Sequence, residues 1–335
     1  MEQGSLELIL TWDGRKILAA GVVSTRPALA RTLCGLSAAR LLEVVPRLFS
    51  LCRHTQAAAT RLSVEAARGE PATSAAGDGL LLPVALETIA EHLYHLLIAW
   101  PTLLDDSSAV PRLSEFGGWR KRFLPAVVDR AAAAALGAEL SAWLARFELP
   151  LLDDQEPAPL TVGLLPQLTA SECASLIDRD DFASAPTLAG QPAETGVLAR
   201  QAEAPAVAAL LARCQRVKAR LLARLIELRW LAAGLCDLPR LSRLLDASAI
   251  TAGLGLARVE TARGMLLHRT ELDGERVVSH LIIAPTEWNF HPRGAFVREI
   301  SGCSASTRLA AQRAAGRLAL SLDPCVPCAL RLVDA

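Results

Sequence analysis

Residues 253–294 read GLGLARVETARGMLLHRTELDGERVVSHLIIAPTEWNFHPRG and contain a clear β-hairpin pattern. Two apolar, β-prone runs flank the pair Asp273-Gly274, and Asp-Gly in this position is typical of a tight hairpin turn. The same arrangement occurs near the N-terminus, where LELILTW and RKILAAGVV flank Asp13-Gly14. Because both hairpins alternate in polarity, we expect them to pair into one small sheet.

Between the hairpins, apolar residues recur at helical spacing. We expect helices over residues 27–68, 84–100, 119–147, 204–234 and 305–320. The helix at 204–234 has an apolar stripe and a separate arginine stripe, which we interpret as a solvated face: Arg213, Arg216, Arg220 and Arg224. The sequence therefore predicts a mainly α protein with a small β-sheet (α+β).

The chain has no linker long enough to indicate two domains, so we expect a single domain over residues 1–335. Its expected parts are an N-terminal hairpin (1–25), a helical part (27–148), an irregular segment (150–200), a long helix (204–236) and a final part with the second hairpin, a helix and a cysteine tail (253–335).

The composition narrows the function classes. Of the 335 residues, 52% are hydrophobic, which is enough for a substantial core. Basic and acidic residues balance at 35 each, so the net charge indicates neither a nucleic-acid nor a membrane partner. The apolar helix near 84–100 carries two Glu and two His, and we interpret it as too short to cross a bilayer. Without a signal-peptide pattern, we expect a cytoplasmic protein whose eight cysteines are reduced thiols.

The C-terminal tail, DPCVPCALRLVDA (323–335), carries Cys325 and Cys328 between two prolines. A C-x-x-C pair can share one metal ion or form a dithiol switch, and the prolines stiffen the backbone around it. A lone pair is a weak signal. The tail by itself leaves metal binding, redox chemistry and no role equally open.

Motifs spread along the chain resemble those of the large subunit of nickel-iron hydrogenases. The E-x-P-R-G and P-[ST]-x-W-N elements of that family correspond to ETARG (260–264) and PTEWN (285–289), and its final D-P-C-x-x-C corresponds to DPCVPC (323–328). GQPAETGVLAR (190–200) and EHLYHLLIAWPTLL (91–104) resemble two further elements. The resemblance implies a shortened large-subunit-like fold, with a central helical bundle and two β-hairpins.

The chain departs from that family at the metal ligands. The family's R-x-C-G-x-C corresponds to RLFSLC (47–52), so Phe49 replaces the cysteine that binds only nickel. Cys52 and Cys328 match the two thiolates that bridge nickel and iron, and Cys325 matches a terminal nickel ligand. The resemblance therefore implies that the iron side of the site is retained and the nickel side is incomplete.

Two more departures concern proton transfer and the metal environment. The family's proton-passing Glu falls at Ala30, and a His near its metal site falls at Arg331. We expect no nickel and no magnesium, and no hydrogenase activity.

This pattern resembles the HupK/HoxV family of hydrogenase maturation proteins. The resemblance implies a scaffold that catalyses nothing and holds an Fe(CN)₂CO unit, with Cys52, Cys325 and Cys328 as metal ligands. It places Arg263 over the site and Thr286, with its neighbour Pro285, beside a cyanide; a guanidinium and a hydroxyl are suitable donors to cyanide nitrogen.

The implied partners are a HypC-type chaperone, a HypD-type assembly protein for the iron unit and the hydrogenase large subunit as recipient. We expect the tail to fold back so that its two cysteines meet Cys52.

Three other readings remain. The chain could be a zinc-binding or thiol-switch protein that uses Cys325 and Cys328 alone, a residual hydrogenase, or an interaction protein that binds no metal. Among the histidines, packing is the expected role of His92 and His95, while His291 lies close enough in sequence to PTEWN to approach the site.

Overall fold

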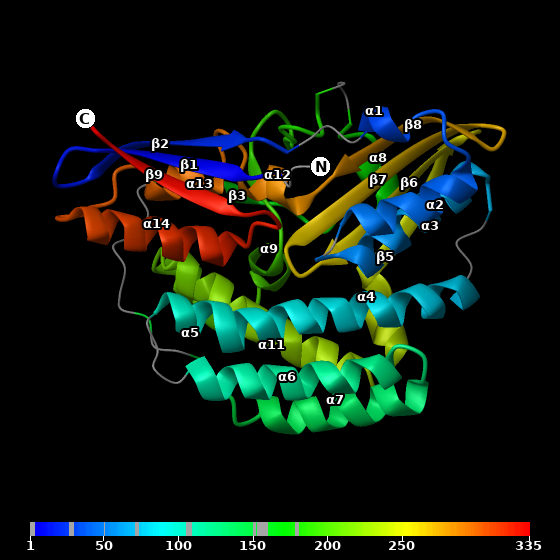
Figure 1. Ribbon diagram of the computed structural model, residues 1–335, viewed down its shortest axis with the longest axis horizontal. Coiled ribbons are helices and arrows are strands. Elements are labelled where there is room, and N and C mark those ends of the chain that lie inside the picture. Colours follow the sequence, from blue (N-terminus) through cyan, green and yellow to red (C-terminus); the bar gives the residue numbers. More distant parts are fainter. Residues whose placement is uncertain are drawn as a thin grey trace.

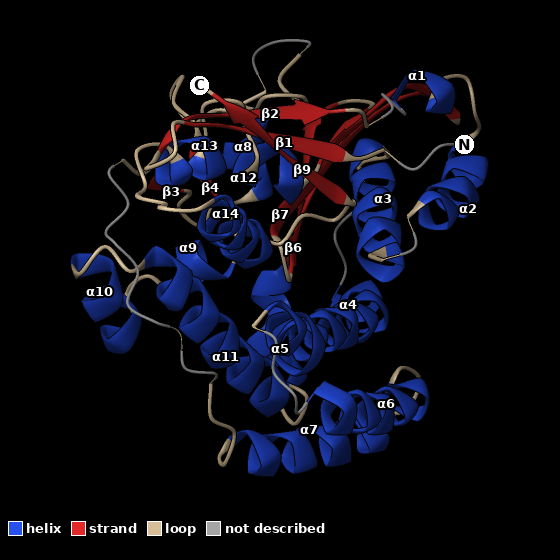
Figure 2. Ribbon diagram, turned by 60° about the vertical axis from the view of Figure 1, so that its left-hand side comes forward, coloured by secondary structure: helices blue, strands red, loops and turns tan. Residues whose placement is uncertain are grey.

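The structure is a computed structural model that describes residues 4–26, 30–49, 51–70, 74–104, 109–149, 152, 160–177 and 181–335. Two β-sheets lie on one side of the molecule and the long helices on the other (Figures 1 and 2). The fold is mainly α with small sheets, as predicted.

The second predicted hairpin lies in a four-stranded antiparallel sheet of order β5-β6-β7-β8. Its strands are β5 (Leu245–Thr251), β6 (Leu254–Thr261), β7 (Gly264–Asp273) and β8 (Arg276–Ile283). Helix α3 (Arg53–Ala67) packs on this sheet at Gly255, where an added Cβ would lie 2.2 Å from the carbonyl oxygen of Ser63. The close approach of helix and strand therefore depends on a residue without a side chain.

The first predicted hairpin is β1 (Leu6–Trp12) with β2 (Ile17–Ser24), and it lies in a separate sheet. The prediction that the two hairpins share one sheet was wrong. The reason is the C-terminal tail: β9 (Cys328–Asp334) pairs in parallel with β1, which gives the order β2-β1-β9. In Figure 1 the red tail runs beside the blue N-terminal strands. A two-stranded sheet joins β3 (Gly163–Leu164) and β4 (Ala193–Glu194).

The remaining elements are helical. They are α1 (Ala30–Leu33), α2 (Ala38–Leu48), α4 (Ser74–Tyr94), the π-helix η1 (His95–Ala99), α5 (Trp100–Leu103), α6 (Ala109–Ala126), α7 (Arg130–Leu144), α8 (Ala170–Ala174), α9 (Val197–Gln201), α10 (Pro205–Ala212), α11 (Arg216–Gly234), the 3₁₀-helix η2 (Leu238–Leu244), α12 (Pro285–Asn289), α13 (Ala295–Ile300) and α14 (Arg308–Leu322).

Most of the predicted helical stretches are divided in the structure; the stretch 27–68, for example, contains α1, α2 and α3. The stretch 119–147 falls into α6 and α7, because Pro125 lies at the end of α6 and the Asp129 side chain caps α7 by accepting from the Ala131 backbone N–H. The long helix 204–236 is α10 followed by α11, because Cys214 adopts a left-handed φ of 57° between them. The helix predicted at 84–100 begins at Ser74 and passes into the π-helix before Pro101.

The prediction of a solvated arginine stripe on α11 was wrong for three of the four side chains. Arg213 is exposed, but Arg216, Arg220 and Arg224 are 8%, 2% and 3% exposed. They face buried carboxylates: Arg220, for example, binds Glu194 and Glu299. A buried charge requires such a partner, and these partners lie on segments far away in the sequence.

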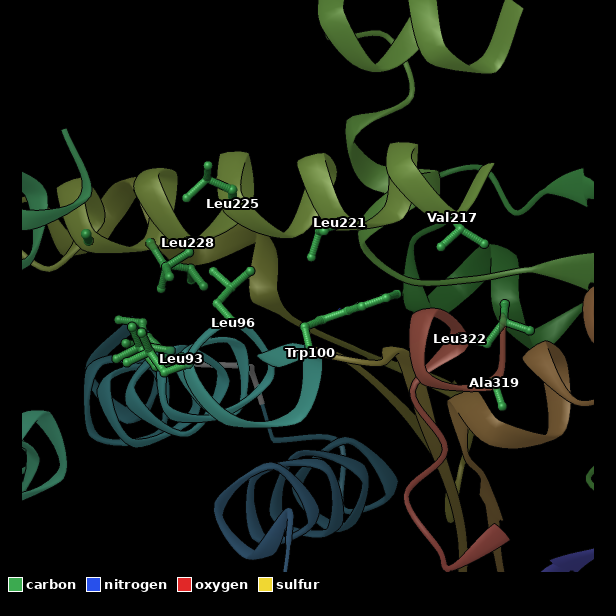
Figure 3. Close-up of a cluster of buried hydrophobic side chains, with 14 of the residues drawn as sticks. Leu93, Leu96, Trp100, Val217, Leu221, Leu225, Leu228, Ala319 and Leu322 are labelled. Atoms are coloured by element: carbon green, nitrogen blue, oxygen red, sulfur yellow. The ribbon is translucent and has the colours of Figure 1, made fainter. Parts of the chain in front are cut away.

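The main hydrophobic core lies between α4, η1, α5, α11 and the end of α14, where the cysteine tail begins. Leucines of α4 and η1 face those of α11, and the Trp100 ring extends between α5 and α11 toward Leu322, the last residue of α14 (Figure 3). Trp100 is 1% exposed and Leu322 is 3% exposed. This packing fixes the end of α14, from which the tail emerges.

Among the described residues, one helical stretch, Gly79–Leu103, is long and apolar enough to cross a membrane by length and composition. The expectation that this region is too short was therefore wrong. However, 67% of its most apolar window is buried within the protein, which fits the core helix of a globular fold.

Candidate metal centre at the cysteine tail

The cysteine tail is anchored at its first residue. Asp323 ends α14 in the left-handed conformation, with φ 57°, and its backbone N–H donates to the carbonyl oxygen of Ala319. Its carboxylate lies 2.9 Å from His95 Nε2, 3.1 Å from Arg263 Nε and 3.1 Å from Arg224 Nη2. Burial raises the pKa of Asp323, but the charge of Arg263, the hydrogen bond from His95 and the charge of Arg224 hold it well below its usual range.

Arg263 occupies the two-residue turn between β6 and β7. The Thr261 hydroxyl accepts from the backbone N–H of Arg263 at 3.0 Å, and the Asn289 amide donates to the Arg263 carbonyl oxygen at 3.2 Å. Gly196, with φ 115°, lies against the same carbonyl: an added Cβ would be 2.8 Å from the oxygen. The backbone of Arg263 is thus held from three directions.

The Arg263 guanidinium is 8% exposed and lies between two carboxylates. Its Nη2 donates to Glu91 Oε2 at 2.7 Å, in addition to the ion pair with Asp323. Burial alone would lower the pKa of Arg263, but the charges of Asp323 and Glu91, followed by those of Cys325 and Cys52, raise it instead. Arg263 is therefore a fixed cation within electrostatic range of two thiols.

Thr286 contacts the first cysteine of the tail. It lies in the first turn of α12, after Pro285, which begins that helix. Its hydroxyl donates to Cys325 Sγ at 3.1 Å and accepts from the Cys325 backbone N–H at 3.3 Å. The structure thus brings two of the predicted site residues, Thr286 and Cys325, into contact.

Cys52 reaches the same region from the N-cap of α3. Its Sγ accepts from Gln56 Nε2 at 3.7 Å. Burial first, then the proximity of Cys325 and Glu87, raise the pKa of the Cys52 thiol to about 12 against the opposing effect of Arg263. Cys52 thus lies close enough to both Cys325 and Arg263 to respond to their charges.

Cys328 begins β9 at the surface, where its Sγ is 3.8 Å from the carbonyl oxygen of Val326. Partial desolvation and the neighbouring charge on Cys325 raise the pKa of Cys328 to about 11. Within the described part of the chain, no three His, Cys, Asp or Glu side chains are arranged as a ready-made metal site. The three cysteines share one region, but they do not form a closed cage.

Sequence reasoning missed much of the polar surroundings of the tail. His92 and His95 were predicted to pack, and both are buried; each also contacts a carboxylate, Glu227 at 3.0 Å and Asp323 at 2.9 Å. Burial lowers the pKa of both imidazoles to about 4, so both are neutral at pH 7. The Nδ1 of His291 accepts from the neighbouring backbone N–H of Arg293, a local contact.

The sequence signal that could have indicated this network is the Asp of the DPC motif, Asp323, whose carboxylate contacts His95, Arg224 and Arg263. A small cavity of about 10 Å³ lies beside it, lined in part by Arg220, Arg224, Arg263 and Asn289.

Comparison with known proteins identifies the family. Hydrogenase expression/formation protein HupK of Bradyrhizobium diazoefficiens is 34% identical over 90% of this chain and 89% of its own length. HupK of Rhizobium leguminosarum bv. viciae is 31% identical over 96% and 95%, and HoxV of Cupriavidus necator is 29% identical over 92% and 91%. The chain belongs to the HupK/HoxV family. Its curated relatives are named as hydrogenase expression/formation proteins, which indicates a role in hydrogenase formation.

Solved structures show the same fold. The Ni-Fe-Se hydrogenase of D. vulgaris Hildenborough superposes with a TM-score of 0.68, covering 94% of each chain at 13% identity. The enzyme of Desulfomicrobium baculatum gives a TM-score of 0.68 at 14% identity, over 94% of this chain and 95% of that one. No family model matches the chain. The HupK/HoxV family thus has a hydrogenase large-subunit fold.

Proposed function

We propose that this protein is a non-catalytic scaffold that holds an Fe(CN)₂CO unit during hydrogenase formation. The observation that carries the proposal is the convergence of three distant segments on the tail. Thr286 binds Cys325, Arg263 pairs with Asp323, and Cys52 lies within electrostatic range of both Cys325 and Arg263.

The donors fit the cargo. An iron that carries three diatomic ligands needs only two or three further ligands, and soft thiolates suit it. Cyanide nitrogen accepts hydrogen bonds, and the buried Arg263 Nε lies 3.1 Å from Asp323 Oδ1 without making a hydrogen bond. Thr286 and Arg263 are the donors that would face the diatomic ligands, while Cys52, Cys325 and Cys328 would bind the iron.

The thiols fit a thiol switch less well. A dithiol switch needs a thiolate at neutral pH, hence a lowered pKa, whereas the pKa values of Cys52 and Cys328 are raised. A structural zinc site would need four ligands, and the described residues offer no such cluster. The iron unit already carries three ligands, so it needs fewer ligands from the protein than a zinc ion does.

In this proposal a HypC-type chaperone, with a HypD-type protein, supplies the iron unit in the cytoplasm, and the hydrogenase large subunit receives it. The names of the relatives support a place in hydrogenase formation, and the large-subunit fold suits a protein that mimics the final recipient. Loss of the nickel-only thiolate at Phe49 leaves a nickel site incomplete, so the unit is held and not converted into a working centre.

The test is infrared spectroscopy on protein purified without oxygen from a host with active hydrogenase maturation, with iron and nickel assayed on the same sample. We expect cyanide and carbonyl stretches, iron, and no nickel. Cys52→Ala and Cys328→Ala should lose the bands and the iron, whereas Cys236→Ala, on an exposed residue far from the tail, should keep both. Retention of the unit by both site variants would refute the proposal, and zinc without bands would favour a zinc protein.

A further inference from the structure

An arginine that the family motifs do not include lies beside the thiols. The sheet order explains its place: Leu6, at the start of the central strand β1, pairs with Ser24 on β2 and with Cys328 on β9. The end of β2 and the start of β9 therefore lie at the same end of the sheet, on either side of β1. Arg26 leaves the sheet where the cysteine tail enters it, and Gly4 packs closely on its backbone, since an added Cβ would lie 2.6 Å from Arg26 Cα.

Arg26 forms an ion pair with Glu287, the residue after Thr286. Both side chains are 17% exposed. Arg26 Nη1 donates to Glu287 Oε1. The other carboxylate oxygen, Glu287 Oε2, is buried without a hydrogen-bond partner. A buried carboxylate oxygen without a partner is unfavourable. The Arg26–Glu287 pair therefore leaves one carboxylate oxygen unsatisfied.

The Arg26 guanidinium also responds to the cysteines. Burial lowers its pKa, but the charges of Glu287, Cys325 and Cys52 together raise it. Arg26 is thus a second cation within electrostatic range of both thiols, and it approaches from β2, whereas Arg263 approaches from the β6–β7 turn.

The charge of the cargo makes a second cation necessary. Iron(II) with two cyanides and two or three thiolates carries a net charge of −2 to −3, and a buried anion of that size is costly unless cations pair with it. Arg263 and Arg224 already face Glu91 and Asp323, so their charge is balanced. Arg26 is held by one carboxylate, so it can exchange that partner for the anionic unit.

We propose that Arg26 is a further binding residue for the anionic iron-cyanide unit, with Glu287 as its partner before the unit arrives. The inference rests on the proposed function and extends it. When the unit enters, the Arg26 guanidinium turns from Glu287 to a thiolate or a cyanide nitrogen, with no change in covalent bonds.

The experiment compares Arg26→Gln and Glu287→Gln in protein purified with its maturation partners as above. If the ion pair were only structural, both substitutions would break it and both would have equal effects. If Arg26 binds the unit, Arg26→Gln should lower the iron and the cyanide bands at least about tenfold, while Glu287→Gln keeps them because Arg26 remains. A tenfold loss corresponds to about 1.4 kcal/mol.

Controls separate binding from folding. Arg26→Lys should retain part of the unit and shift the cyanide stretches, because an ammonium keeps the charge but lacks the planar fork. Arg53→Gln, on an exposed residue next to Cys52, should match the wild type, and thermal melts check the fold of every variant. Bands in the wild type with unchanged content and frequencies in Arg26→Gln would overturn this inference alone. The absence of bands from the wild type would overturn it together with the proposed function.

Discussion

Burial, together with the proximity of Cys325, raises the pKa of the Cys52 thiol to about 12 and that of Cys328 to about 11. At neutral pH both therefore carry a proton in the metal-free protein. A metal ion that bound here would displace that proton, and without it the protonated thiols resist oxidation. No sequence motif carries this property, because it depends on which atoms surround each sulfur.

The prediction at this scale concerns alkylation. At pH 8 and constant iodoacetamide, Cys52 and Cys328 should react at least about tenfold more slowly in the native protein than in urea. The lower thiolate fraction outweighs the greater nucleophilicity of a more basic thiolate. Quenched labelling followed by peptide mass spectrometry gives the rate at each cysteine. Equal native and unfolded rates at both positions would contradict the raised pKa values.

The sequence predicted helix α11, but it assigned the arginine face of this helix to solvent, which was wrong. Its periodicity predicts a helix, but hydrophobicity alone assigns the arginine stripe to solvent. In the structure the stripe is buried and forms ion pairs with Glu194 from β4 and Glu299 from α13. Both carboxylates lie outside the helix, so its own sequence does not indicate them. The arginine face of α11 therefore lies inside the protein, where Arg224 pairs with Asp323 at the start of the tail.

The prediction at this scale compares two arginines of the stripe. Arg220→Ala removes one of the two arginines that pair with Glu194 and Glu299 and leaves both carboxylates with Arg216 alone. The buried cluster then has one uncompensated negative charge, which costs roughly 3–5 kcal/mol. Arg213→Ala, on an exposed residue, should change the unfolding free energy by less than about 0.5 kcal/mol. Urea denaturation of both variants measures the difference. Similar values for the two would show that the buried network contributes little.

At the scale of the molecule, local signals predicted both hairpins, and the motif order predicted the large-subunit fold. The parallel pairing of β1 with β9 was not predicted, because it joins residues more than 300 positions apart and leaves no local pattern. The candidate site follows the same rule. Its cysteines, Arg263 and Thr286 lie in motifs, whereas Arg26 and Glu287 meet only after the sheet has formed.

Buried histidines give the whole molecule a characteristic pH dependence. Burial lowers the pKa of His92, His95 and His280 to about 4, and that of His268 well below its usual value of 6.5. Because the folded pKa lies below the unfolded one, the unfolded chain binds more protons between pH 6.5 and 4. Their stabilisation is fully present above pH 6.5 and is lost as the pH falls toward 4, by about 1.4 kcal/mol per pH unit for each histidine.

Thermal unfolding at pH 7.5, 6.5, 5.5 and 4.5 should therefore give a plateau above pH 6.5 and a steep fall below it. Glu194, with a pKa of about 2, loses its contribution only at lower pH and does not shape this window. Burial raises the pKa values of Glu91 and Glu287, so proton binding by these two carboxylates in the folded protein opposes part of the fall. His280 lies beside His268, with ring centroids 5.0 Å apart, so His280→Gln should make the fall less steep. A melting temperature that stays constant down to pH 4.5 would mean that the histidines already carry protons in the native protein, contrary to the effect of their burial.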